Sequence, residues 1–580
     1  MPRVHRILAA AMTLLTGIAI WAFFAFKYPY HLHFQEQYQL FEWTGKYFVD
    51  VASVPGGLSD WLGRCLTQFF YYAPLGAVLM AVLLCGLQLL TWAVCRNRTL
   101  TDYVLSFIPA LLMLAFYCDE NALVGGAFAL ILSLACAALC LLIRPDRARH
   151  IVEVLLVPLL YLACGGLCLV FVLVTAIREV DRCGWRVWPW IVACLALAVL
   201  CPLVARYCFP YPLGRLAFGV HYYRYHNIVP GLLWVSALSV PVVVLVSCFR
   251  ARVARWWPGV ALFAALAAVG TVFVLRVADP AKEEWMRYDF MVRMQMWNRI
   301  MLQADRHNPD TPKTVSCLNL ALAMSGRMPD SQFEYFQNGP DGLLPGFTRD
   351  HTNPVSTGEI FWHLGMVNTA QRYAFEAQEA IPDFQKSARV YKRLAETNIV
   401  NGDVKVARKY LDALHNTLFY RSWAEETAAL LTKGEIFDKR PELARARDLR
   451  LKEHDFLFSD TEMDSMLGLL KVEHPENNVA LEYLMAWCLL RKDLDRFVEC
   501  IGMVDAPAMP KAYQEALLLR WVLTHSDFNG LPQYLDPAHA RRISQFITDA
   551  RAARPEAEMQ RAYGDTYWFY YYYRYRSAQE

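Results

Sequence analysis

Long apolar stretches dominate the first half of the chain. A helix needs about 20 apolar residues to cross the hydrocarbon core of a bilayer. Seven stretches approach or exceed this length, and they predict membrane-spanning helices at 7–26, 71–95, 103–118, 121–143, 188–205, 228–249 and 257–276. The first has a basic start, but Lys27-Tyr-Pro-Tyr follows it where a signal peptide would have a small-residue cleavage site. We therefore expect a retained anchor.

One further apolar segment, 151–177, is interrupted by Gly165-Gly166. It could form one long tilted span or two half-helices that reverse at the glycines. Lys and Arg are enriched in loops on the inner side of a membrane, so their distribution separates the two models. With the hairpin and an inner N-terminus, 13 Lys and Arg lie in inner loops and 6 in outer loops, whereas a single span gives 10 and 9. The charges favour the hairpin and nine membrane segments in total.

This topology places two loops, 28–70 and 206–227, on the outer side together with the C-terminal half of the chain. The inner loops are short and basic. We therefore expect any chemistry on the outer face.

The second half predicts a soluble all-α domain. Apolar residues recur three and four positions apart through stretches such as 283–304, 404–416 and 511–524, which is the period of an amphipathic helix. Several pairs of stretches resemble the helix–turn–helix units of tetratricopeptide (TPR) repeats, although the repeat length of about 34 residues is not kept. We expect a TPR-like domain that offers a concave surface to a protein partner; a helical cap on the membrane domain is the alternative. The aromatic run 567–575 is expected to dock on this domain or at the membrane interface.

Charge and composition divide the chain at the same place. Residues 1–278 contain 20 Lys and Arg against 11 Asp and Glu, whereas 279–580 contain 37 against 43. We predict a transmembrane domain over 1–278 and a helical-repeat domain over 279–580. A content of 56% hydrophobic and 19% charged residues excludes a disordered chain, and the net charge of +3 is too small to indicate a nucleic-acid partner. Thirteen of the 16 cysteines precede residue 279, nearly all inside apolar runs, which is typical of buried side chains rather than a zinc site.

The first outer loop, 28–70, carries the candidate catalytic residues. Its aromatic spacing predicts two amphipathic helices in the membrane interface, joined by a turn at 54–58. The polar face of the first helix would carry His31, His33, Gln35, Glu36, Gln39 and Glu42. A carboxylate there could act as a general base or ligate a divalent metal, and Glu36 is the first candidate, with Glu42 second. The alternative is interfacial anchoring.

The second outer loop, 206–227, predicts a phosphate site. It combines three arginines and two histidines with many aromatic residues. The planar guanidinium of arginine makes two-pronged contacts to phosphate, so Arg215, His221 and Arg224 would suit a lipid-linked phosphate. Anchoring to lipid headgroups is the alternative. Asp119 and Glu120, in a tight turn on the same face, are accessory candidates or a simple polar turn.

Four motifs carry a family resemblance. HLHFQEQYQLF at 31–41, PGGL at 55–58, FGVHYYRY at 218–225 and LNLALA at 318–323 resemble an uncharacterised multi-pass membrane protein family of the Bacteroidota. The resemblance covers the whole chain and implies no activity. We expect a bacterial inner-membrane protein, and the topology that the Lys and Arg distribution favours places its N-terminus in the cytoplasm and its C-terminal domain in the periplasm.

The membrane half also resembles, in outline, the C-type glycosyltransferases. Those enzymes have a first span, a long outer loop with interfacial helices and an acidic residue, and many further spans. The resemblance implies transfer of a sugar or related group from a polyprenyl-phosphate donor on the outer face, with Glu36 as the acidic residue. The sequence departs from their usual Asp-containing pair, because Gln35-Glu36-Gln37 stands there. The second hypothesis is a non-enzymatic scaffold whose TPR-like domain recruits a partner for envelope assembly or secretion.

Overall fold

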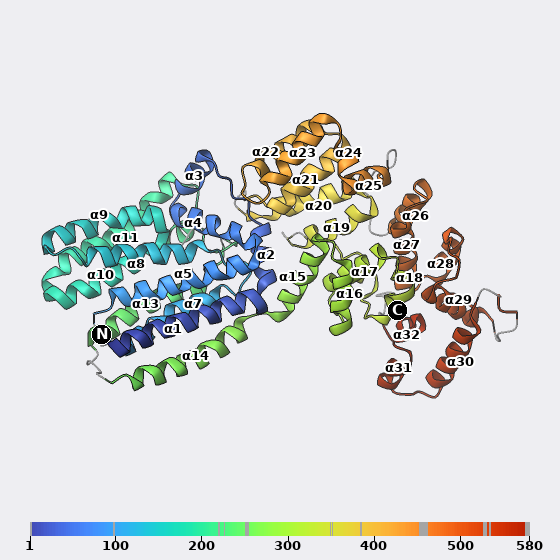
Figure 1. Cartoon of the computed structure of the whole chain (residues 1–580), viewed down its shortest axis with the longest axis horizontal. Coiled ribbons are helices and arrows are strands. Elements are labelled where there is room, and N and C mark those ends of the chain that lie inside the picture. The colour runs from blue at the N-terminus through green and yellow to red at the C-terminus, as the bar shows by residue number, and fades with distance from the viewer. Residues whose placement is uncertain are drawn as a thin grey trace. The chain divides into compact units, whose positions relative to one another are not determined.

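The computed structural model describes the chain except for residues 1–2, 97–98, 219–220, 226, 250–254, 349, 351, 383–384, 452–461, 526–529, 533–534 and 575–580. The described residues form helices and connecting loops (Figure 1), and the one extended pairing among them is an isolated antiparallel bridge between Ala122 and Tyr223. The predicted all-α class is confirmed.

The chain divides into two compact units. Unit 1 comprises Met1–Glu283 together with two later segments, Pro382–Arg389 and Asp412–Ala424. Unit 2 comprises Glu284–Ile381, Val390–Leu411 and Glu425–Glu580. The first unit thus contains the predicted membrane domain and two short pieces of the second half.

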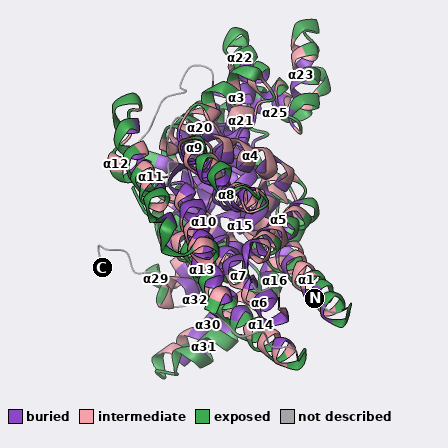
Figure 2. Cartoon of the chain, turned by 90° about the vertical axis from the view of Figure 1, so that its left-hand side faces the viewer, coloured by how far each residue is buried: buried purple, intermediate pink, exposed green. Residues whose placement is uncertain are grey.

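Unit 1 is a bundle of long helices accompanied by shorter ones (Figure 1). The long helices are α1 (Arg3–Ala22), α5 (Ala73–Val94), α8 (Gly125–Cys140), α9 (Asp146–Cys164), α10 (Cys168–Cys183), α11 (Trp188–Cys208), α13 (Gly231–Phe249) and α14 (Trp257–Val277). The short ones are α2 (Pro29–Gln37), α3 (Gly45–Ala52), α4 (Gly57–Thr67), α6 (Leu100–Leu105), α7 (Phe107–Phe116) and α12 (Leu213–Phe218). Buried residues gather around α8 and α10 (Figure 2).

Five helical stretches of this unit are long and apolar enough to cross a membrane. They are Arg3–Lys27, Ala73–Val94, Asp146–Cys208, Gly231–Phe249 and Trp257–Val277. Large apolar side chains also point outward from these helices; Leu14, Val82 and Val269 are 66%, 64% and 68% exposed. Such a surface suits lipid better than water. The stretches are compatible with membrane insertion, while the number of spans and their orientation stay predictions.

The chain reverses at Gly165-Gly166. Arg149 near the start of α9 forms an ion pair of 2.6 Å with Glu179 near the end of α10, so the two helices run antiparallel. Gly165 has a φ of +55°, which disfavours other residues. A side chain at Gly166 would clash, because a Cβ there would lie 1.9 Å from the carbonyl oxygen of Ala217. The predicted reversal at these glycines is confirmed.

Unit 2 is a stack of helices, several of them paired through short turns. Its helices are α15 (Pro280–Arg293, which begins in unit 1), α16 (Trp297–Arg306), α17 (Pro312–Met324), α18 (Met328–Ser331), α19 (Asn353–Leu364), α20 (Val367–Ala380), α21 (Ala388–Asn401, which begins in unit 1), α22 (Val404–His415, which ends in unit 1), α23 (Arg421–Lys433, which begins in unit 1), α24 (Ile436–Lys439), α25 (Pro441–Leu449), α26 (Met463–Glu473), α27 (Asn478–Leu490), α28 (Leu494–Cys500), α29 (Lys511–Thr524), α30 (Pro537–Arg551), α31 (Glu556–Tyr563) and α32 (Tyr567–Tyr573). α19 and α20 illustrate the pairing, with Gly365 in the left-handed conformation (φ +91°) at the turn between them.

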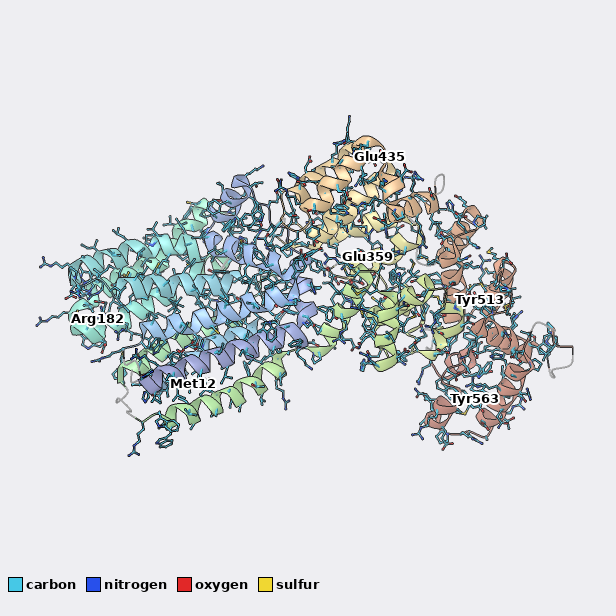
Figure 3. All side chains as sticks on the ribbon, viewed as in Figure 1. Met12, Arg182, Glu359, Glu435, Tyr513 and Tyr563 are labelled. Carbon is cyan, nitrogen blue, oxygen red and sulfur yellow. The ribbon has the colours of Figure 1, made fainter. Side chains whose placement is uncertain are left out.

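The aromatic run near the C-terminus lies in the core of unit 2. It forms α32, in which Tyr567 and Trp568 are fully buried. Tyr513 of α29 and Tyr563 of α31 belong to the same core (Figure 3). The run therefore docks on the helical domain, which is one of the two locations that the sequence predicted.

Replacing Gly166 by alanine should destabilise the protein. Overpacking of this kind costs about 1–3 kcal/mol, because the carbonyl of Ala217 must move. Gly86→Ala is the matched control: Gly86 lies inside α5 with open space around its Cβ position, so alanine should be neutral or stabilising by up to about 1 kcal/mol. Thermal unfolding of the detergent-solubilised protein measures both, and equal melting temperatures for the two variants would contradict the tight contact.

Candidate functional site

The helix that carries the predicted catalytic residues, α2, is buried inside unit 1. It begins at Pro29, whose fixed φ suits the first position of a helix. Its free backbone N–H groups at Tyr30 and His31 donate to the carboxylate of Glu283, at 2.8 and 3.0 Å. Most of its polar side chains are buried. The expectation of an amphipathic helix with an exposed polar face is therefore wrong for α2, because other protein segments cover that face.

Glu36 is buried against the segment Asp412–Ala424 of the same unit. The hydroxyl of Tyr420 donates a hydrogen bond of 2.9 Å to Glu36 Oε1. Phe419 stacks on Tyr71, with ring centroids 5.0 Å apart, and closes the side of the site. The remaining cavity beside Glu36 has a volume of about 20 Å³, which admits a water molecule or a hydroxyl group but not a sugar ring.

Glu42, the second catalytic candidate, has a separate partner. Lys386 Nζ lies 2.9 Å from Glu42 Oε1. Next to it, Ser387 donates to the backbone oxygen of Gln37 at 2.6 Å, and Arg389 donates to the Gln37 side chain at 3.0 Å. Glu42 thus forms an ion pair that holds the segment Pro382–Arg389 against the rest of unit 1. The geometry gives no reason to pair Glu42 with Glu36 in one reaction.

Arg224 is a buried cation that lies against an aromatic ring. Its backbone N–H donates to Asn121 at 2.8 Å, which fixes the loop. Its guanidinium lies over the ring of Tyr38, 5.5 Å from the centroid, at the end of α2. No carboxylate of the described residues forms an ion pair with it, and its Nε has no hydrogen-bond partner among them. Burial lowers the pKa of Arg224, against the opposing effect of nearby groups that include Asp119 and Glu120.

The other two phosphate candidates lie together at a different ring. The guanidinium of Arg215 lies 4.4 Å from the centroid of Tyr211. The ring of His221 meets the same tyrosine edge-on, with centroids 6.3 Å apart. Both side chains are buried. The structure therefore brings Arg215 and His221 together at Tyr211 and places Arg224 at Tyr38.

The accessory candidates have structural partners. Asp119 accepts from the backbone of Asn121 at 2.9 Å and from the hydroxyl of Tyr223 at 2.8 Å. Glu120 forms an ion pair of 2.8 Å with Lys282. These contacts fit the polar-turn interpretation of the pair. His31 is buried against Tyr28, with ring centroids 5.2 Å apart, whereas His33 is half-buried.

An apolar groove runs between α1, α7 and α14. It has a volume of about 360 Å³. Its lining is almost entirely apolar and includes Phe23, Leu114, Phe263, Leu266 and Val274. Leu114 lies near the end of α7, and the turn that follows α7 is the one that holds Arg224 through Asn121. The groove runs along α7 from Phe107 to Leu114, so one end of it and Arg224 flank the same end of α7.

The sequence analysis missed a second polar cluster, formed by His150, Glu153 and Glu179. A signal was present, because residues three apart share one face of a helix. A reversal at Gly165 also brings residue 179, which follows it by 14 positions, close to the residues that precede it by about 14 positions.

A family of unknown function, DUF6057, matches residues 4–574, so the chain belongs to that family. Neither a curated protein nor a solved structure matches the chain.

Acidification should destabilise unit 1 through His31. Burial lowers the pKa of His31 to about 4 from the ordinary 6.5. Below pH 6.5 the unfolded chain therefore binds a proton that the folded protein does not, and stability falls as the pH drops from 6.5 toward 4, by up to about 3 kcal/mol.

Thermal unfolding at about pH 7.5 and about pH 5 tests this sign. From the higher pH to the lower, the melting temperature of the unmodified protein should fall, and that of His31→Gln should fall by less. His307→Gln is the control, because His307 is largely exposed. The expectation fails if His31→Gln and His307→Gln have the same pH dependence.

Proposed function

We propose that this member of the DUF6057 family binds a lipid carrying a phosphate or pyrophosphate group and transfers a sugar or related group from it on the outer face of a bacterial inner membrane. The observation that carries the proposal is Arg224, a buried guanidinium that has no carboxylate ion-pair partner among the described residues. A TPR-like unit 2 would serve the acceptor or a protein partner.

The free-energy cost of burying the Arg224 charge favours the binding of an anion there. Burial of an unpaired charge costs several kcal/mol. The aromatic face of Tyr38 offsets part of that cost, since cation–π contacts contribute about 0.5–2 kcal/mol. A phosphate would supply the opposite charge and accept two parallel N–H donors from the guanidinium. Arg224 would hold the phosphate and stabilise its charge as it leaves.

The apolar groove supports the lipid part of the proposal. An isoprenoid or acyl tail needs a long apolar lining, and the groove between α1, α7 and α14 offers one within helices that suit a membrane. Because the groove and Arg224 flank the same end of α7, one lipid could place its tail in the first and its phosphate at the second.

Glu36 would act as the general base of the transfer. An acceptor hydroxyl would lose its proton to the Glu36 carboxylate, its oxygen would bond to the anomeric carbon, and the bond between that carbon and the phosphate oxygen would break. Tyr420 holds the carboxylate in place by its 2.9 Å hydrogen bond. The small cavity beside Glu36 has room for one hydroxyl group and not for a sugar ring, so the transfer would require the segment Asp412–Ala424, which closes the cavity with Phe419 and Tyr420, to move aside. No metal is required by this scheme, although Glu36 could also ligate a divalent cation.

Lipid content tests the proposal directly. Mass spectrometry of lipids that co-purify with the protein should detect a polyprenyl phosphate or a related phosphate-bearing lipid. Arg224→Gln should reduce its occupancy at least about tenfold, corresponding to a lost charge-assisted contact of roughly 1.5–3 kcal/mol. Arg276→Gln is the control, since Arg276 is an exposed arginine at the end of α14. Equal occupancy in both variants would exclude Arg224 as the phosphate site.

A scaffold is the second candidate function, and the contacts of Glu36 and Glu42 favour it. Both carboxylates hold segments of the second half on unit 1, which is a structural task. On this proposal the helical unit recruits a protein partner for envelope assembly or secretion.

Complementation separates the two functions. In cells lacking the native gene, Glu36→Gln and Arg224→Gln should each fail to restore the phenotype if the protein is a transferase. Both should restore it if the protein is a scaffold, provided that immunoblots show normal amounts in the membrane.

A further inference from the structure

We propose that His150, Glu153 and Glu179 bind a divalent cation of the first transition row, at the end of unit 1 where α9 begins and α10 ends. One ligand atom from each of the three residues lies within 4.8 Å of the others. All three residues are buried. The site is independent of the proposed lipid site, because it uses none of the same residues.

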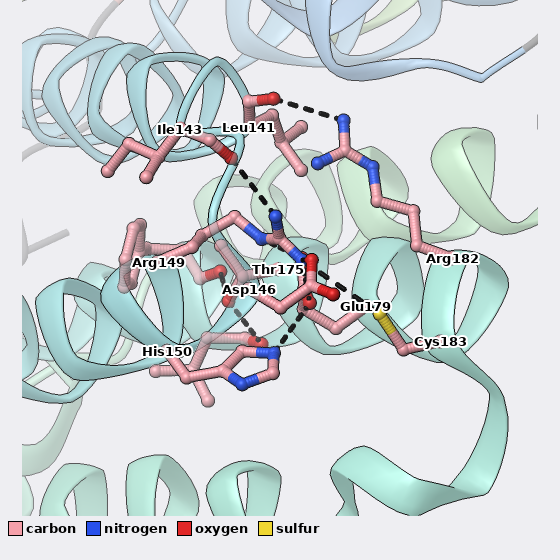
Figure 4. A network of polar contacts seen from close by, with 11 residues as sticks. Leu141, Ile143, Asp146, Arg149, His150, Thr175, Glu179, Arg182 and Cys183 are labelled. Atoms are coloured by element: carbon pink, nitrogen blue, oxygen red, sulfur yellow. Dashed lines mark hydrogen bonds and ion pairs between the residues drawn. The ribbon is translucent and has the colours of Figure 1, made fainter.

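The antiparallel pairing of α9 and α10 builds the cluster. His150 and Glu153 lie three residues apart on one face of α9. Glu179 of α10 faces them, with its Oε2 2.8 Å from His150 Nε2 (Figure 4). Two ligands of one zinc-sized ion lie roughly 3–3.5 Å apart, so a cation could enter between the imidazole and the carboxylate after a small expansion.

The unsatisfied oxygen of Glu153 points to a ligand. Glu153 is only 4% exposed, and its Oε1 has no hydrogen-bond partner among the described residues. Buried carboxylates are normally paired or coordinate a metal. The adjoining cavity has a volume of about 10 Å³, which suits an ion and not an organic molecule.

The net charge of the buried groups also favours the binding of a cation. Arg149, Glu153 and Glu179 are the buried charges of the cluster, and their sum is −1. Arg149 donates to both oxygens of Glu179, at 2.6 and 2.7 Å, and to Asp146 at 2.7 Å (Figure 4). This contact orients the Glu179 carboxylate in the way that outer partners orient metal ligands. The His150 ring stacks on Trp190, with centroids 5.5 Å apart, which restricts its rotation.

The donor set selects the kind of ion. One imidazole nitrogen and two carboxylates suit Zn²⁺, Mn²⁺ or Fe²⁺, whereas Ca²⁺ and Mg²⁺ take oxygen ligands almost exclusively. Three protein ligands leave at least one coordination position for water.

Zinc binding to the full-length protein in detergent tests the site. After treatment with a chelator and titration with Zn²⁺, we expect about one tightly bound ion per chain by elemental mass spectrometry, and Glu153→Gln should weaken binding at least about tenfold. Asp181→Asn is the matched control, since Asp181 lies on the same end of α10 but pairs with Arg178 at 3.2 Å. Zinc retention that is equal in the Glu153→Gln and unmodified proteins would overturn the proposal, because the ion would then not be bound by Glu153.

Cobalt substitution gives a second readout that needs no variant. Co²⁺ bound by the unmodified protein should produce visible absorption bands and X-ray absorption with a nitrogen ligand from His150. Binding through oxygen alone, or no stoichiometric binding, would contradict the assignment.

Discussion

The reversal of the chain at Gly165-Gly166 is the constraint on which unit 1 depends. Backbone N–H and C=O groups that a turn leaves without helical hydrogen bonds must form other hydrogen bonds inside an apolar bundle. Here those hydrogen bonds come from several segments that meet at the turn. The Leu162 carbonyl accepts from Gly56 at 2.8 Å, and the Cys164 carbonyl accepts from the hydroxyl of Tyr222. Gly166 rests on Ala217. The two outer loops of the sequence prediction are thus tied to the same turn.

Unit 1 contains two kinds of buried arginine. Arg149 has a complete set of acceptors, including both oxygens of Glu179. Arg224 has the face of Tyr38 and no ion-pair partner among the described residues. A fully paired charge is a structural element, and its removal would leave the buried Glu179 without its ion pair to Arg149 and with the contact to His150. An unpaired charge is instead a site that an anion can fill, which is why the proposed function rests on Arg224.

The sequence predicted the parts of the structure that depend on local composition. Apolar stretches marked the helices of unit 1, and the distribution of arginines identified the reversal at Gly165. The surroundings of Glu36 could not be predicted, because its partner Tyr420 lies 384 residues further along the chain. Lys386, the partner of Glu42, is 344 residues away. Polar residues on α2 therefore suggested a face open to headgroups, whereas distant segments of the protein cover them.

The inclusion of Pro382–Arg389 and Asp412–Ala424 in unit 1 has a consequence for biosynthesis. During translation, the apolar helices emerge first, while the segments that cover α2 are still to be made. Gln37, Glu36 and Glu42 then lack their partners until the ribosome has added more than a hundred residues beyond α14. Unit 1 is therefore an incomplete fold when its apolar helices first leave the ribosome, and a chain terminated near residue 280 would expose these buried polar groups.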